Sequence, residues 1–398
     1  MKNIQSIWKF LTNPGMICMI LTLCISTACE DGLMENPKSL AVETFYNTPK
    51  EVEAAVNAIY SPLRQAYYTI GFNSTHSDYA LGRGSWAPLN DFEGLNSVWI
   101  TRISEVWTYY YQGIRNANIV INNAPKGKAI SQADIDKYVG EAKFLRAFTY
   151  FQLVRHWGGV PIRTELNINE LETPRSTEEN VYELILEDLI DAEAKLPNDQ
   201  PVSGRPNKMA AKTLLADVYL QLGQYEDARD KAQEVIQSQK YSLVPVATVD
   251  DFQNIFGATV VTTPEEVFYL KFSHEPGQGD TWPGLMNHPA TGLYGGGGVY
   301  GVHSDSSLPF YIDWDDDDLR KALWYPFNIG VGATSLLSKK LIDPQSLSLG
   351  GAGNPQTWYR YADVLLIFAE AEARAENSTT AEAIWRTGKT QLACSWET

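Results

Sequence analysis

The chain has little cysteine for its length. Only 4 of its 398 residues are cysteine, and Cys18 and Cys24 lie in an N-terminal segment that has the features of a removable signal. Cys29 and Cys394 remain, whereas a disulfide framework needs several pairs. We therefore do not expect disulfide bonds to hold this fold together.

Long hydrophobic runs are also missing. A membrane-spanning helix needs about 20 apolar residues, and charged residues interrupt every later apolar segment. The apolar run Met16–Ile25 follows Lys2 and Lys9 and leads into the small residues Ser26–Ala28. This order is typical of a secretory signal, so we predict that residues 1–28 are a signal peptide and that the chain is exported.

Cys29 directly follows the signal. A cysteine after a small residue at this point is where bacterial lipoproteins are cleaved and acylated, although Ser26 stands where leucine is usual. We interpret Cys29 as a lipid attachment site and residues 29–47 as a lipid-anchored tether. Ordinary cleavage nearby, with an incidental thiol, is the alternative.

Positive charge is scarce. The chain has 32 basic and 48 acidic residues, and losing Lys2 and Lys9 with the signal takes the net charge from -16 to -18. Such a surface repels phosphate backbones, which argues against nucleic acid as a partner.

Motifs that mark catalysis or cofactors are absent from the sequence. There is no HExxH or GxSxG, and "LYGGGGVYG" (residues 293–301) lacks the Gly-Lys-Ser/Thr of a phosphate loop. We expect that stretch to be a flexible loop displaying Tyr294 and Tyr300. Among the many acids no pair can be singled out for glycoside hydrolysis. The sequence thus predicts no cofactor, no metal and no enzyme site.

One acidic run needs separate comment. Residues 313–318 resemble the start of a calcium loop, but Asp318 and Trp324 stand where glycine and glutamate are required. We expect a solvated loop ahead of a helix that begins at Leu319, where acids suit the helix dipole. Calcium binding stays open.

What the chain does have is helical periodicity in long capped segments. A capping box at Thr48–Glu51 opens the first helix, and Ser131 caps the third. In residues 214–236, Gly223 supplies a turn while Ala216 and Ala228 allow close approach, as in a tetratricopeptide pair. The segments expected to be helical are 49–63, 97–123, 132–157, 177–196, 214–236 and 359–376.

The expected fold is therefore mostly α: a tetratricopeptide-like helical-repeat scaffold with a loop-rich segment that contains a few short strands. We divide the single domain 48–398 into an N-terminal helical part (48–240), a loop-rich insertion (241–355), and a C-terminal helix with an atypical tail (356–398). Within the insertion, "EVFYLKFS" (residues 266–273) is rich in β-forming residues and predicts a strand.

Two loops combine aromatic residues with polar ones and lack helical or strand periodicity. They cover residues 76–91 and 279–300. A sugar ring has an apolar face and a hydroxyl rim, so its site needs a flat aromatic surface edged by hydrogen-bonding groups. Burial of these aromatics in a core is the alternative. The candidate glycan-binding residues are Asp78, Tyr79, Arg83, Trp86, Trp282, Tyr294 and Tyr300.

The chain resembles the SusD/RagB-like family of Bacteroidetes surface lipoproteins. The resemblance is carried in order by "CEDGLMENP", "TPKEVEAAVNAIYSPLR", "IRNANIVINNA", "GEAKFLRAFTYFQLVRHWGGVPI", "GRPNKMAAKTLLADVYLQLGQYEDA" and "WYRYADVLLIFAEAEA". It implies four tetratricopeptide-like units, glycan binding without catalysis, a lipid anchor at Cys29 in the outer membrane, and docking onto a SusC-like TonB-dependent transporter. It also places the binding loops in the two stretches already singled out.

The tail "AEAIWRTGKTQLACSWET" departs from the family pattern, and we expect it to reflect a C-terminal truncation. Two further hypotheses stay open beside glycan capture. One is a helical-repeat interaction protein that acts mainly as a scaffold for the transporter. The other is a glycosidase.

Overall fold

The structure is a computed structural model that describes residues 45–90, 94–200, 202–330 and 332–375. The chain divides into two compact units, Met1–Phe45 and Tyr46–Thr398, and the account below concerns the second. The signal peptide, Cys29 and the tail after residue 375 lie outside the described residues, so their expected roles stay predictions.

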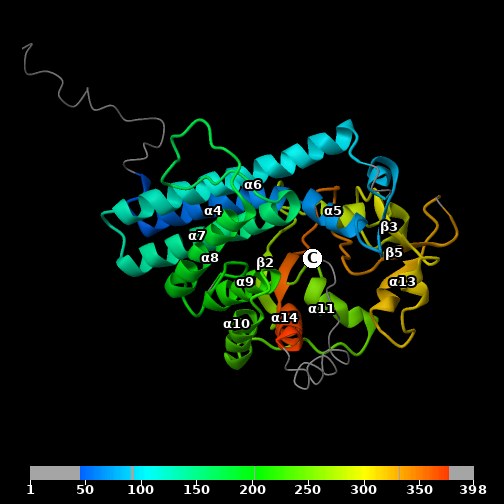
Figure 1. Ribbon diagram of the computed structural model, residues 1–398. Helices are drawn as coiled ribbons and strands as arrows, with labels where there is room; N and C mark the ends of the chain where they lie inside the picture. Colours follow the sequence, from blue (N-terminus) through cyan, green and yellow to red (C-terminus); the bar gives the residue numbers. More distant parts are fainter. Residues whose placement is uncertain (1–44, 91–93, 201, 331, 376–398) are drawn as a thin grey trace, which may run out of the picture. The chain divides into compact units, whose positions relative to one another are not determined.

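Seven long helices form the main layer of the described part, and each packs against the next along the chain (Figure 1). Among the described residues, no helix is both long enough and apolar enough to cross a membrane. The helices of this layer are α4 (Pro49–Gln65), α6 (Ser97–Asn123), α7 (Gln132–Trp157), α8 (Glu178–Lys195), α9 (Lys208–Gln221), α10 (Tyr225–Gln237) and α14 (Tyr361–Arg374).

Local capping chemistry sets the ends of these helices. The Thr48 side chain accepts from the Glu51 backbone N–H while Glu51 reaches back to the Thr48 N–H, so the expected capping box opens α4. Ser131 caps α7, which ends at Gly158 with φ 68°. The segment 97–123 is α6 with the bounds expected from its periodicity. The capping signals therefore locate these helices correctly.

Helix α7 lies at the centre of the layer and is almost wholly buried from Tyr138 to Val154. Arg146, on this helix, is only 2% exposed. Its Nε and Nη2 donate to the Asp188 carboxylate of α8 at 2.6 and 2.8 Å, and its Nη1 donates to Asn118 Oδ1 of α6 at 2.7 Å. One buried guanidinium thus ties three consecutive helices together.

The repeat-like pair is α9 with α10. Gly223 makes the turn between them with φ 74°, a conformation that residues with a Cβ rarely adopt. Ala216 and Ala228 are fully buried where the two helices meet. The spacing of small residues seen in the sequence therefore corresponds to a close helix–helix contact.

Outside the long helices, the described residues form two small antiparallel sheets and several short helices, most of them in the loop-rich segment after α10. One sheet has the order β1-β3-β5-β4, and the other pairs β2 with β6. The strands are β1 (Leu81–Gly82), β2 (Glu266–Leu270), β3 (Val302–Asp305), β4 (Trp324–Pro326), β5 (Ser335–Ser338) and β6 (Gln356–Arg360). The short helices are α5 (Tyr68–Thr75), α11 (Gln253–Phe256), α12 (Trp282–Leu285) and α13 (Pro309–Ile312), with 3-10 turns η1 (Gly84–Leu89), η2 (Ala124–Lys126), η3 (Val249–Phe252), η4 (Pro289–Thr291) and η5 (Lys321–Leu323).

Two expected helix starts were wrong. The last helix begins at Tyr361, because Tyr359 and Arg360 belong to β6 and pair with β2. No α-helix begins at Leu319: a single 3-10 turn, η5, is followed at once by β4. In both places residues whose local pattern suits a helix lie in or next to a strand: β6 pairs with the distant β2, and β4 pairs with the nearby β5.

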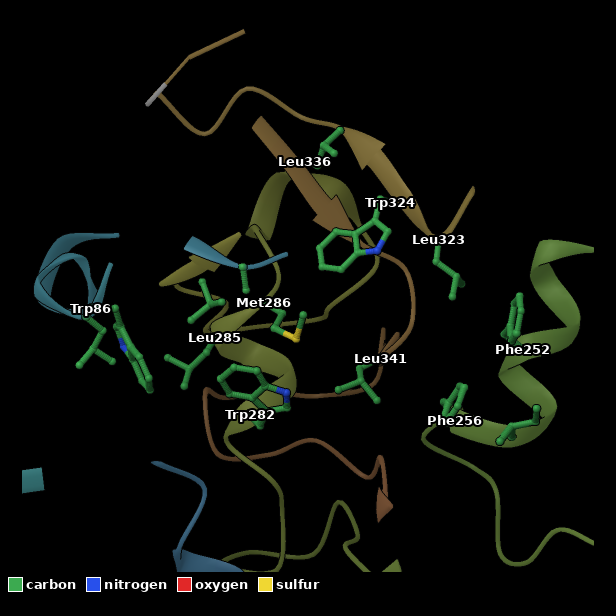
Figure 2. Close-up of a cluster of buried hydrophobic side chains, with 14 of the residues drawn as sticks. Trp86, Phe252, Phe256, Trp282, Leu285, Met286, Leu323, Trp324, Leu336 and Leu341 are labelled. Carbon is green, nitrogen blue, oxygen red and sulfur yellow. The ribbon is translucent and has the colours of Figure 1, made fainter. Parts of the chain in front are cut away.

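A separate hydrophobic core holds the loop-rich part together. Trp86, Trp282 and Trp324 belong to one buried cluster with Leu285 and Met286 (Figure 2). The Trp86 ring centroid lies 4.8 Å from that of Trp99 on α6 and 6.3 Å from that of Trp282 on α12. The aromatic side chains of the first loop therefore connect the helical layer to the later loops.

Asp188→Asn should destabilise the protein by about 3 kcal/mol, because it removes the buried carboxylate partner of Arg146 and leaves that guanidinium only the partly exposed Glu165. Asp191→Asn on the same helix is a matched control. Asp191 is 28% exposed and pairs with Lys143 and Lys195, so its loss should cost less than about 1 kcal/mol. Urea unfolding of both variants measures the difference. Equal losses would show that the buried pair is not a special determinant of stability.

Candidate functional site

An open cleft of about 560 Å³ lies between the segment after α5, helices α11 and α13, and strands β4 and β5. We call it the aromatic cleft. Its aromatic lining residues are Tyr79, Phe252, Phe256, Phe310, Trp314 and Trp324, and its polar lining residues are Ser77, Asp78, Asp313, Arg320, Ser338 and Lys340. A concave surface that mixes rings with a few polar groups is typical of small-molecule sites.

The rings of the cleft contact one another at angles. The Tyr79 centroid lies 5.9 Å from that of Trp324 and 6.4 Å from that of Phe310, while Phe310 lies 6.0 Å from Trp314. Tyr79, Phe310 and Trp314 are half-buried, so parts of their rings face the opening. Such side chains offer flat apolar surface while remaining fixed by their neighbours.

The polar edge of the cleft is held by ion pairs and hydrogen bonds. Arg320 donates from Nε to both carboxylate oxygens of Asp318, at 2.8 and 2.9 Å. Trp314 Nε1 donates to the same carboxylate at 3.1 Å, which fixes the indole ring. Burial alone would raise the pKa of Asp318, but these hydrogen bonds outweigh burial and hold that pKa below its usual range.

The acidic run around the cleft is engaged in local interactions. Asp315 accepts from the Asp317 backbone N–H at 3.0 Å, and Asp316 pairs with Lys321 at 2.6 Å. Among the described residues, no group of three His, Cys, Asp or Glu side chains is placed to hold a metal ion. The run therefore positions Trp314 and Arg320 through turns and ion pairs.

The seven candidate residues from the sequence fall into three groups. Asp78, which is exposed, and Tyr79 line the aromatic cleft. Arg83 and Tyr300 meet elsewhere: the Arg83 guanidinium lies 4.2 Å from the Tyr300 ring centroid, and His288 lies 4.3 Å from the same ring. Asp78 and Tyr79 therefore lie together in the cleft, and Arg83 and Tyr300 contact each other outside it.

The third group is buried. Trp86, Trp282 and Tyr294 are 4%, 3% and 1% exposed, so none has a free ring face for a sugar. The expectation of direct stacking on these three rings is corrected on this ground, because each ring is already packed by protein. These three side chains instead follow the alternative stated above, that the loop aromatics are buried in a core.

The glycine-rich stretch, residues 293–301, packs closely against another backbone segment, whereas we expected a flexible loop that displays Tyr294 and Tyr300. A Cβ on Gly295 would lie 2.3 Å from the Ser346 carbonyl oxygen, and one on Gly297 would lie 2.3 Å from the Leu349 backbone nitrogen. The Tyr294 hydroxyl lies 3.0 Å from the Ser348 carbonyl oxygen. These glycines allow two backbone segments to touch, which is why Tyr294 is turned inward.

Sequence reasoning missed most of the cleft. Phe310, Trp314, Trp324 and Arg320 lie in a segment that was interpreted through its acids. Trp314 carried the same signal as Trp86, an aromatic residue among polar ones without periodicity. Only the fold distinguishes the half-buried ring from the buried one.

The sequence matches known protein families and individual proteins. A family model described as "Starch-binding associating with outer membrane" matches residues 34–220, and a model of the SusD family matches residues 326–386. SusD-like protein P2 of Formosa agariphila is 30% identical, over 89% of this chain and 76% of that protein. The chain belongs to the SusD-like family.

Further SusD-like proteins are similar to this chain in sequence or in fold. SusD-like protein P25 of Formosa agariphila is also 30% identical, over 66% of this chain and 52% of that protein. A solved SusD superfamily structure from Bacteroides vulgatus superposes with a TM-score of 0.74 at 20% identity, covering 88% of this chain and 81% of that one. A laminarin-binding SusD-like protein superposes with a TM-score of 0.69 at 22% identity, covering 87% and 89%. The expected mostly α, tetratricopeptide-like fold is thereby confirmed.

One buried acid holds the loops of this SusD-like chain in place. Asp280 is 2% exposed, and its Oδ1 accepts from the Trp282 backbone N–H at 3.1 Å and from Gln356 Nε2 at 3.0 Å. Burial raises the pKa of Asp280 to about 6, although these hydrogen bonds act in the opposite direction. The carboxylate thus fixes the start of α12 beneath the core.

Asp280 should make stability depend on pH. Its folded pKa lies above its ordinary value of 3.8, so the folded state binds the proton more tightly. Its contribution is then complete below pH 4 and is lost as pH rises through about 6. Asp280→Asn keeps an oxygen acceptor and cannot ionise, so at pH 7 it should be more stable than wild type by up to about 3 kcal/mol.

Urea unfolding at pH 4, 5, 6 and 7 measures this effect as the difference between wild type and Asp280→Asn. We expect the advantage of the variant to grow from pH 4 to pH 7. Parallel stability curves for the two proteins would contradict a raised pKa at this position.

Proposed function

We propose that the protein captures neutral oligosaccharides at the cell surface on its aromatic cleft and passes them, without catalysis, to a TonB-dependent outer-membrane transporter. The observation that carries the proposal is the cleft itself: half-buried rings of Tyr79, Phe310 and Trp314 with a hydrogen-bonding edge. The family model describes starch-binding proteins, and one neighbour in fold is laminarin-binding. Starch and laminarin are neutral glucans, so we take this class as the first ligands to test.

The chemistry of the cleft suits a neutral glycan. The apolar face of a sugar ring can lie on an aromatic ring, and its hydroxyls can meet carboxylates, hydroxyls and guanidinium groups at the edge. Asp78 and Asp313 are exposed at this edge, while Arg320 is already paired with Asp318. Free negative charge here disfavours acidic sugars by like-charge repulsion.

The expected affinity is modest. Each aromatic contact is worth about 0.5 to 1.5 kcal/mol, so a few contacts with edge hydrogen bonds give Kd values of about micromolar to millimolar. Weak sites are suitable for capture and release, because a polysaccharide can engage many anchored copies at once.

The location and the partner belong to the same proposal. A lipid on Cys29 would hold the protein at the outer membrane, with residues 29–47 as the tether. Stable anchoring needs more than one acyl chain, so we propose a multiply acylated cysteine. Because the chain has an excess of acids, it repels nucleic acid but does not repel a polymer of neutral sugars.

Trp314→Ala and Tyr79→Ala should each weaken glucan binding by about 2- to 10-fold, because each removes one ring surface from the cleft. Trp107→Ala is the matched control. Trp107 is also half-buried but packs against Tyr111 and Trp157 in the helical layer. Calorimetric titration with laminarin and malto-oligosaccharides measures the affinities.

These measurements can also contradict the proposal. If Trp314→Ala and Tyr79→Ala bind as tightly as the wild type, the aromatic cleft is not the glycan site. Glucose release from either polysaccharide by the pure protein would instead support the glycosidase hypothesis.

A second candidate function is a scaffold that acts mainly through its transporter partner. The observation favouring it is the segment between α7 and α8, where Leu166 and Leu171 are 90% and 95% exposed. This segment is held in shape, since Arg163 donates to the backbone carbonyl of Leu171 at 3.1 Å and Asn167 Nδ2 donates to that of Ile162 at 3.0 Å. Large apolar side chains on an ordered loop are typical contact points for another protein.

Co-purification with the transporter distinguishes the two functions. Leu166→Asp combined with Leu171→Asp should reduce co-purification at least about tenfold, through lost apolar contact and added charge, and should leave glucan affinity unchanged. Trp314→Ala should do the reverse. If both sets of variants lose both activities, the two surfaces do not act separately.

A further inference from the structure

A second cleft, of about 580 Å³, lies between α4, residues 202–205 and the end of β2. It shares no lining residue with the aromatic cleft, and nothing in the proposed function uses it. We propose that this cleft binds a hydroxylated carboxylate of the uronic acid class, with the Arg64 guanidinium as the partner of the carboxylate.

The cleft is lined by more cations than acids. Arg64, Arg205 and Lys271 line it, against Glu53 as the one acidic lining residue among those described. Two of these cations already have partners. Arg205 pairs with the fully buried Glu141 at 3.1 Å and with Glu53 at 3.2 Å, and Lys271 pairs with Glu266 at 2.5 Å.

Arg64 differs from the other two. Within the part of the chain that the structure describes, it forms no ion pair with a carboxylate. Its Nη1 and Nη2 donate to the side-chain and backbone oxygens of Gln278 at 2.5 Å, and its guanidinium lies 4.5 Å from the Phe272 ring centroid. Gln278 and Phe272 therefore hold the guanidinium in position, while none of its five N–H donors meets a carboxylate of the described residues.

The surroundings of Arg64 disfavour its bare charge. Burial lowers the pKa of Arg64, and Asp280 offsets this only in part. Its Nε is buried and has no hydrogen-bond partner. A bound carboxylate would supply the missing counter-charge, and a planar guanidinium fits a carboxylate better than an ammonium does.

The rest of the lining indicates the class of ligand. Asn57, Ser61 and Ser203 are neutral polar residues on the wall, suited to the hydroxyls of a sugar. The volume is in the range of small-molecule sites. Glu53 pairs with Arg205 at 3.2 Å, so Arg64 is the lining cation left to meet an anion, and one carboxylate on a hydroxylated ring is the best match.

Titration of the full mature protein with D-galacturonate and with D-galactose tests the proposal, because the two sugars differ only in the carboxylate. We expect galacturonate to bind at least about tenfold more tightly, and Arg64→Gln to abolish the difference. Arg102→Gln is the matched control: Arg102 is a half-buried arginine over the Trp99 ring and does not line this cleft.

A second variant tests the same cleft without changing Arg64, in case Arg64→Gln does not fold. Ser61→Trp fills the cleft from an exposed position on α4 and should also abolish galacturonate binding. Both variants should keep the wild-type affinity for glucans, which separates this site from the aromatic cleft. Equal binding of the two sugars, galacturonate binding that survives both variants, or no binding at about 20 mM would each overturn the proposal.

Discussion

The contact on which the functional part of the molecule depends is the packing of Trp86. Its ring lies against Trp99 of the helical layer and Trp282 of the later loops. A Cβ on Gly71 would lie 2.2 Å from the Trp86 ring, so α5 can approach only because position 71 has no side chain. This close fit fixes α5, and Tyr79 follows a few residues later. The cleft is thus positioned by a tryptophan that no ligand can reach.

The sequence predicts those features that local chemistry decides. The Thr48 capping box and the turn at Gly223 with Ala216 beside it are short-range signals, and the structure contains them where they were expected. The helices expected at Leu319 and from Tyr359 fail because strand pairing overrides the local preference, with the nearby β5 in the first case and the distant β2 in the second.

The candidate site was only half predictable for the same reason. Tyr79 and Trp86 lie seven positions apart in one loop and carry the same signal, yet one lines the cleft and the other is buried. Trp314 was missed because its acidic neighbours dominated the interpretation of that segment. Whether a ring faces solvent is decided by contacts with residues far away in the sequence, and periodicity contains no information about those contacts.

The order in which the elements pair has a consequence for how the chain acquires its shape. From α4 to α10, the neighbouring long helices of the layer follow one another along the chain, so their contacts are local enough to form early. In contrast, Leu81 pairs with His303 and Glu266 with Arg360, and such distant pairings are slow because a long loop must close first. The aromatic cleft should therefore be among the last parts to form, and until then its tryptophans remain open to aggregation and to proteases.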